Sequence, residues 1–165
     1  MSDAGDRVDR LRKLAGLMLG ASVRSCELRP AHGLDLFLVR LPGAPPVPDW
    51  VEGELRLRVL THGWRLETRE RVIAAALDPA KELGSALAVL VGQAVSGLEI
   101  ARPGLDTTIY FGDVRLRIFP VSTRPLPEGH PAWTLRTAQH VSLVVGPGAN
   151  WGMSGRKPTQ QEAAQ

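Results

Sequence analysis

The feature that most constrains this chain is a pattern that occurs twice. Residues 54–68, ELRLRVLTHGWRLET, alternate between apolar and charged side chains, and a similar alternation returns within residues 114–137 as VRLRIF and AWTLRT. Alternation with a period of two is typical of strands that bury one face. A chain that carries the pattern twice is expected to hold two copies of one β-rich unit.

A shift of the chain against itself by 72 residues (92 minus 20) extends this match. The shift places Gly20 on Gly92 and Glu27 on Glu99. It also places the apolar segment DRLRKLAGLMLG at residues 9–20 on KELGSALAVLVG at residues 81–92. The sequence therefore predicts an internal duplication that begins near the N-terminus.

Each copy is predicted to open with a helix and to continue as an antiparallel meander. The two aligned apolar segments carry leucines at helical spacing, and Asp78-Pro79 favours the start of the second helix, with Asp78 as N-cap. Short alternating runs bounded by glycine and proline follow each helix, and Gly112-Asp113 suits a two-residue hairpin turn. The expected strands are residues 22–29, 34–41, 54–60 and 63–73 in the first copy, and 94–101, 105–111, 114–120, 132–137 and 140–145 in the second.

The predicted fold class is α+β, with two tandem helix-plus-antiparallel-β-meander repeats forming one pseudo-twofold body. The first repeat is expected at residues 1–77 and the second at residues 78–148. Residues 149–165 are polar and lack periodicity, so we expect them to be a disordered tail. Whether the two repeats share one sheet is left open by the sequence.

Charge and cysteine content narrow the classes of function. Seventeen of the 20 basic residues are arginine, but the net charge is only +3 and is spread along the chain, which does not favour a nucleic-acid binder. The single cysteine, Cys26, can form no internal disulfide and no metal site alone, so we expect a reducing cytoplasm. No segment approaches the roughly 20 apolar residues of a membrane span.

Residues with catalytic potential form no recognisable motif. The four histidines lack the spacing of metal ligands, and no serine lies in a GxSxG turn. With one residue deleted at His32, the alignment places Asp35 on Asp106, beside the pair formed by Glu27 and Glu99. Duplicated acids suit a symmetric site if they converge, although such residues more often fix turns or face solvent. We expect no enzyme, no cofactor and no metal.

Two proline-rich insertions are candidates for partner binding. They are residues 42–53 in the first copy and 121–132 in the second. Loops of this kind lie on the surface, where they either bind partners or only connect strands. Trp50 lies among prolines and is expected either to fold back on the core or to face a partner. The candidate contact residues in these loops are Asp49, Trp50, Arg124 and His130.

Arginines on the alternating strands are the other candidates for partner binding. Arg56 and Arg58 recur as Arg115 and Arg117, and Arg65 and Arg136 join them. Such a ladder suits an acidic protein surface or nucleic-acid phosphates, and it also suits a solvated face that discourages aggregation.

The second copy resembles a family. The order LVGQAVSGLEI, LDTTIYFGDVRLRIFP, WTLRT and VSLVVGPGANW, within residues 82–151, resembles a group of small bacterial proteins of unknown function found next to polymorphic toxins, some of which look like immunity proteins. The first copy matches more loosely, with Leu60-Thr61 where that group has Phe-Pro. The resemblance implies a binding protein and transfers no catalytic residue.

These observations together predict a cytoplasmic, non-enzymatic protein-binding module. The expected partner is another protein, either a toxin or a subunit of a defence or secretion assembly that the module neutralises or scaffolds. The alternative is a small-ligand or nucleic-acid binding module that uses the duplicated arginine faces. No membrane partner is expected, and the oligomeric state is left open.

Overall fold

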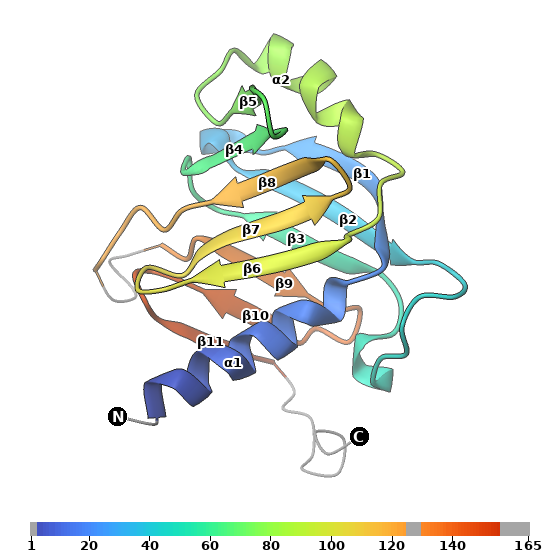
Figure 1. The fold of residues 1–165 in the computed structure, drawn as a ribbon, viewed down its shortest axis with the longest axis vertical. Coiled ribbons are helices and arrows are strands. Elements are labelled where there is room, and N and C mark those ends of the chain that lie inside the picture. Colours follow the sequence, from blue (N-terminus) through green and yellow to red (C-terminus); the bar gives the residue numbers. More distant parts are fainter. Residues whose placement is uncertain (1–2, 125–129, 156–165) are drawn as a thin grey trace.

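Two antiparallel sheets and two short helices make up the computed structural model, which describes residues 3–124 and 130–155 (Figure 1). The helices are α1 (Asp3–Ala15) and α2 (Ala80–Leu87), and each continues into a 3-10 turn, Gly16–Met18 after α1 and Ala88–Leu90 after α2. The predicted α+β class is therefore confirmed. None of the described helices is long and apolar enough to cross a membrane.

Each sheet combines strands from both halves of the chain. Sheet A holds, in spatial order, β1 (Ala21–Leu28), β2 (Leu34–Arg40), β3 (Leu55–Val59), β9 (Trp133–Arg136), β10 (Ser142–Val145) and β11 (Trp151–Ser154). Sheet B holds, in spatial order, β5 (Val72–Ala75), β4 (Trp64–Glu67), β8 (Val114–Ile118), β7 (Asp106–Phe111) and β6 (Gly97–Ala101). The chain passes from sheet A to sheet B after β3, and from sheet B to sheet A after β8.

At each crossing, a strand from the first half of the chain pairs with a strand from the second half, and the two pairs have equivalent registers. β3 pairs with β9 so that Val59 lies opposite Trp133, and β8 pairs with β4 so that Ile118 lies opposite Trp64. An isolated bridge between Ser22 and Ala94 also connects β1 to the segment that precedes β6. The segments 1–77 and 78–148 therefore contribute to both sheets instead of forming two separate sheets.

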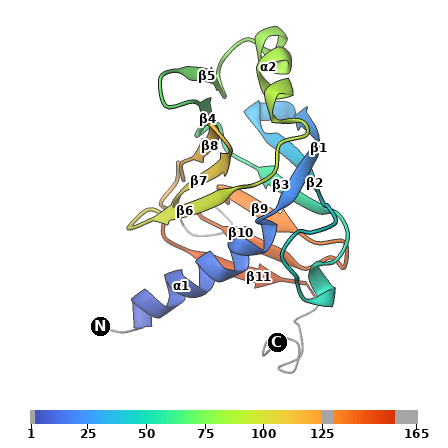
Figure 2. The same ribbon diagram turned by 45° about the vertical axis from the view of Figure 1, so that its right-hand side comes forward.

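One apolar core fills the space between the two sheets. Alternate residues of the strands supply it, and its largest fully buried members include Trp133, Phe111, Leu36, Leu57 and Leu66. The helices add Leu11 and Met18 at one end and Leu83 and Leu87 at the other. Figures 1 and 2 show α1 and α2 at opposite ends of the pair of sheets. Charged residues at the intervening strand positions must therefore lie on the outer faces.

Two predicted boundaries are wrong because side chains form local hydrogen bonds. The expected strand at residues 63–73 is two strands, β4 and β5, since the hydroxyl of Thr68 accepts a hydrogen bond from the backbone N–H of Arg71 and closes a turn. The carboxylate of Asp78 accepts the N–H of Ala75 at 2.8 Å, so it does not cap α2, which begins two residues later without a side-chain cap.

The expectation of a disordered tail at residues 149–165 is wrong for its first part. Trp151–Ser154 form β11, which pairs with β10 so that Val145 lies opposite Trp151. This strand has only four residues and two of them are small, so its own sequence gave little sign of it. Residues 156–165 lie outside the described residues.

Candidate functional site

The predicted arginines lie on two outer faces that point away from the common core. Arg56 and Arg58 alternate with buried residues of β3 on sheet A, and Arg115 and Arg117 alternate with buried residues of β8 on sheet B. Since both strands turn their apolar residues toward one core, the two pairs of arginines face opposite directions. The structure therefore brings the arginines together in pairs and keeps the two pairs apart.

A fully buried carboxylate organises the arginines of sheet A. Asp35 has a side-chain exposure of 0% and accepts hydrogen bonds from Arg29 Nη1 at 3.0 Å, Arg56 Nε at 3.1 Å and Arg58 Nε at 3.2 Å. Arg56 also reaches it through Nη2 and lies 5.1 Å from the ring centroid of Phe37. We call Asp35, Arg29, Arg56 and Arg58 the sheet A cluster.

A second buried carboxylate organises the arginines of sheet B. Glu67 is 6% exposed and accepts hydrogen bonds from Arg65 Nε and Arg115 Nε, both at 2.7 Å, while Arg117 Nη1 lies 3.6 Å from it. Arg65 and Arg117 both lie over the ring of Phe119, at 5.4 and 5.2 Å from its centroid. We call Glu67, Arg65, Arg115 and Arg117 the sheet B cluster.

Two opposing effects set the pKa of Glu67. Burial raises this pKa and is the largest single effect, but the hydrogen bonds and positive charges of Arg115 and Arg65 together outweigh it and hold the pKa below its ordinary value of 4.5. Glu67 is therefore ionised at neutral pH and fixes the guanidinium groups around it.

Each cluster carries more positive than negative charge. Three guanidinium groups surround one carboxylate in both cases, and their side chains remain 31–39% exposed. A guanidinium group has five N–H donors, and none of the six groups uses all of them in the described contacts. The clusters can therefore bind carboxylates or other anions with side chains that are already held in place.

The duplicated acids of the sequence alignment do not converge. Glu27 lies opposite Asp35, and Glu99 lies opposite Thr108, so the register matches Asp35 with Thr108 and not with Asp106 as the alignment had it. Glu27, Glu99 and Asp106 are exposed, whereas Asp35 is buried. The acids that pair with the arginines of the two outer faces are Asp35 and Glu67, and the sequence alone assigns no role to Glu67.

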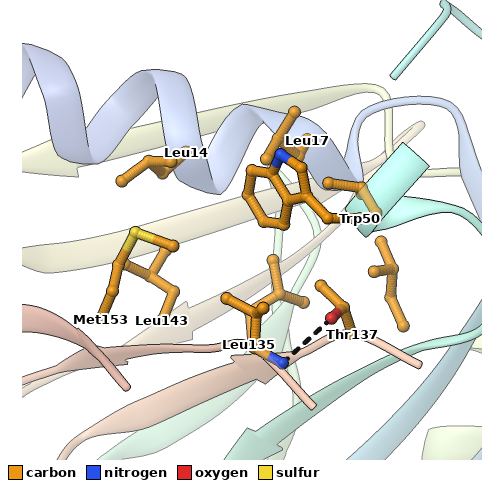
Figure 3. A pocket seen from close by; sticks show the side chains of 10 residues that line it. Leu14, Leu17, Trp50, Leu135, Thr137, Leu143 and Met153 are labelled. Carbon is orange, nitrogen blue, oxygen red and sulfur yellow. Dashed lines mark hydrogen bonds between the residues drawn. The ribbon is translucent and has the colours of Figure 1, made fainter. Parts of the chain in front are cut away.

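Trp50 folds back on the core, one of the two alternatives that the sequence left open. Its indole lies between α1 and sheet A, where it lines a small apolar cavity with Leu14, Leu17 and Met153 (Figure 3). The next residue, Val51, is fully buried. The indole Nε1 is also buried, and the part of the chain that the structure describes offers it no acceptor.

This position predicts a stability effect for Trp50. Trp50→Ala should lower the free energy of unfolding by about 2 kcal/mol, less than the full burial of a tryptophan would give, because the side chain is only partly buried. Trp50→Phe should cost much less, since the indole N–H makes no hydrogen bond with the described residues that phenylalanine would lose. Denaturation in guanidinium chloride measures both, and an unchanged midpoint for Trp50→Ala would return Trp50 to the candidate contact residues.

The other candidate residues of the loops lie at the surface, in two separate insertions. Asp49 is exposed beside Trp50, in the 3-10 turn Asp49–Val51. Arg124 and His130 are exposed in the second insertion, of which residues 125–129 lie outside the described residues. Figure 1 shows the two insertions at opposite sides of the molecule. The loops therefore do not form one surface.

The remaining reactive groups form no cluster in the part of the chain that the structure describes. Burial, followed by the charges of Asp35 and Glu27, raises the pKa of the Cys26 thiol to about 12, so it is protonated at neutral pH. Within residues 3–124 and 130–155, no group of three or more His, Cys, Asp or Glu side chains is placed to hold a metal ion.

No protein-family model matches the chain, and comparisons with curated proteins and with solved structures found no significant match.

Proposed function

We propose that this protein is a non-enzymatic binding module that holds another protein through the arginine-bearing outer faces of its sheets. The partner would be a toxin that the module neutralises, as the resemblance to immunity proteins implies, or a subunit of a toxin, defence or secretion assembly. The observation that carries the proposal is the pair of clusters, each with a buried carboxylate at its centre and an excess of positive charge. The single cysteine, which can form no internal disulfide, is in keeping with a cytoplasmic location.

The physical argument concerns the cost of ordering side chains. An arginine on a protein surface loses rotamer freedom when it binds a partner, and this loss weakens binding. In both clusters the buried carboxylate and a phenylalanine ring already restrict arginines before any partner arrives. Their remaining N–H donors can then bind partner carboxylates at a lower entropic cost.

We also propose that the body consists of two tandem repeats related by a pseudo-twofold axis. Where two units are related by a twofold axis, a hydrogen bond from residue i of the first unit to residue j of the second is matched by one from residue i of the second unit to residue j of the first. The backbone hydrogen bonds between β1 and the segment before β6 follow this rule under the 72-residue shift. They run from Gly20 N–H to Val95 O, from Gly92 N–H to Val23 O, from Val23 N–H to Gln93 O and from Val95 N–H to Ala21 O. The proposed axis passes between Ser22 and Ala94, which pair with each other.

Binding of nucleic acid or of a small anion is the second candidate, because excess positive charge also attracts phosphate. Single-stranded nucleic acid is usually held by aromatic rings that stack on bases. On these faces, arginines cover the rings of Phe37 and Phe119. A protein partner therefore has the stronger support.

Affinity purification from the native host tests the proposed function. The tagged wild type, isolated at moderate salt, should recover one stoichiometric protein partner that mass spectrometry can identify. A double variant, Arg58→Gln with Arg117→Gln, should recover much less of it, because these two arginines make the longest contacts to their carboxylates and can be replaced with least effect on folding. The matched control, Arg69→Gln with Arg71→Gln, removes the same charge from the exposed turn between β4 and β5. Recovery of nucleic acid, or of no partner, would contradict the proposal.

A further inference from the structure

The two clusters differ at several facing positions, and one of them is the position opposite Arg56 on sheet A and opposite its counterpart Arg115 on sheet B. On sheet B, Arg115 of β8 lies opposite Glu67 of β4. On sheet A, the register places Arg56 of β3 opposite Arg136 of β9. Like charges that face each other across an antiparallel pair are destabilising, and opposite charges are stabilising. Sheet A therefore has an arginine where sheet B supplies a carboxylate.

The surroundings of Arg136 do not compensate for this difference. Arg136 is exposed, and its Nη2 lies 2.7 Å from Nδ1 of His140. Among the described residues, no carboxylate lies within ion-pair distance of Arg136. The outer face of sheet A thus carries the sheet A cluster and, beside it, a further guanidinium group that forms no ion pair with a carboxylate in the described part of the chain.

Several N–H donors around this position make no hydrogen bond within the described chain. Arg56 uses Nε and Nη2 to reach Asp35, so its Nη1 is available. Arg58 uses only Nε, and Arg136 uses only Nη2. Donors of this type bind carboxylates in paired, planar geometry.

We propose that a carboxylate of an acidic protein partner docks between Arg56 and Arg136, at the position that Glu67 occupies on sheet B. This inference rests on the proposed function and specifies its chemistry: the partner presents a cluster of aspartate or glutamate side chains to the outer face of sheet A. The docked carboxylate offsets the repulsion between the two facing arginines and supplies Arg56 with an ion pair of the kind that Glu67 supplies to Arg115 on sheet B.

A partner carboxylate suits this position better than a nucleic-acid phosphate. The exposed side chain of Glu27 lies on the same face, opposite Asp35, so it interrupts the positive charge that an extended phosphate backbone would follow. Arg56 covers the ring of Phe37, which leaves that ring unavailable for stacking on a base. A short acidic segment of a protein can bind without an extended positively charged surface and without an exposed aromatic ring for stacking.

An NMR titration with a synthetic octaglutamate peptide tests the inference. The arginine Nε–H signals of Arg56 and Arg136 should shift and saturate as the peptide is added to the wild type. Arg136→Glu supplies the carboxylate from within the chain, so peptide affinity should fall by about tenfold or more, a loss of at least 1.4 kcal/mol, while the melting temperature stays the same or rises. Arg136→Gln, which adds no charge of opposite sign, should also weaken binding. Arg69→Glu makes the same charge change on the turn between β4 and β5 and should bind like the wild type.

The outcomes separate this inference from the proposed function. Equal peptide binding by the wild type and Arg136→Glu, or tighter binding of octathymidylate than of the peptide, would overturn the docking position. Capture of the same protein partner by the wild type and by Arg136→Glu would overturn it as well, and the proposed function would stand. Peptide binding that depends on Arg136, with no protein captured from the host, would support the docking position and contradict the proposed function.

Discussion

Trp133→Ala is expected to destabilise the protein by about 3–5 kcal/mol, a large part of the 5–15 kcal/mol that holds a typical domain together. Trp133 is fully buried on β9, where it joins the central strands of sheet A to the core. Its indole Nε1 donates a hydrogen bond to Thr107 Oγ1 of β7 at 2.9 Å, so it also links sheet A to sheet B. The substitution removes this link and leaves a cavity between the sheets.

Equilibrium denaturation in guanidinium chloride, followed by circular dichroism, measures this effect. Trp151→Ala is the matched control, because Trp151 lies on the edge strand β11 and is only partly buried. We expect the control to cost about 1 kcal/mol. A Trp133→Ala variant that is no less stable than Trp151→Ala would contradict the packing described for the two sheets.

Glu67→Gln is expected to lower the free energy of unfolding by about 2 kcal/mol at neutral pH, because the buried carboxylate accepts two charge-assisted hydrogen bonds. The pKa of Glu67 in the folded protein is lower than its ordinary value of 4.5, so its contribution to stability is complete above that value and is lost as the pH falls through the folded-state pKa. The difference between the wild type and Glu67→Gln should therefore shrink in acid.

Denaturation curves collected at several pH values test this expectation. Glu70→Gln, on the exposed turn that follows β4, is the matched control and should change stability little at any pH. If the gap between the wild type and Glu67→Gln had the same size at about pH 7 and about pH 3, the ion pairs of Glu67 would not be what stabilises the sheet B cluster.

The sequence was sufficient to predict those features that depend on local pattern. Alternation identified the strands around Arg56 and Arg115, and the Gly112-Asp113 turn was correctly predicted to join β7 to β8, with Phe111 opposite Val114. Helical spacing of leucines identified both helices. These features depend on residues close in sequence, which is why one chain alone can reveal them.

The pairing of the strands within the sheets could not be predicted from the sequence. Alternation records which face of a strand is buried and does not record which strand lies beside it. Glu67 is 48 residues from Arg115 in the chain, and the two meet only because β4 crosses to the sheet that contains β8. In the sequence, Asp35 and Glu67 occupy the polar positions of alternating strands, where a residue is expected to face solvent. Their burial depends largely on arginines of other strands. Arg65 and Glu67 lie on one strand, but their spacing alone does not show that Glu67 is buried.

Arginine-specific labelling with phenylglyoxal, read by mass spectrometry, tests the central claim most directly when it is applied to the complex with the captured protein partner. If the outer face of sheet A holds the partner, Arg56, Arg58 and Arg136 should react much more slowly in the complex than in the free protein, while Arg69 reacts at the same rate in both. Unchanged labelling of these three arginines in a stoichiometric complex would contradict the account.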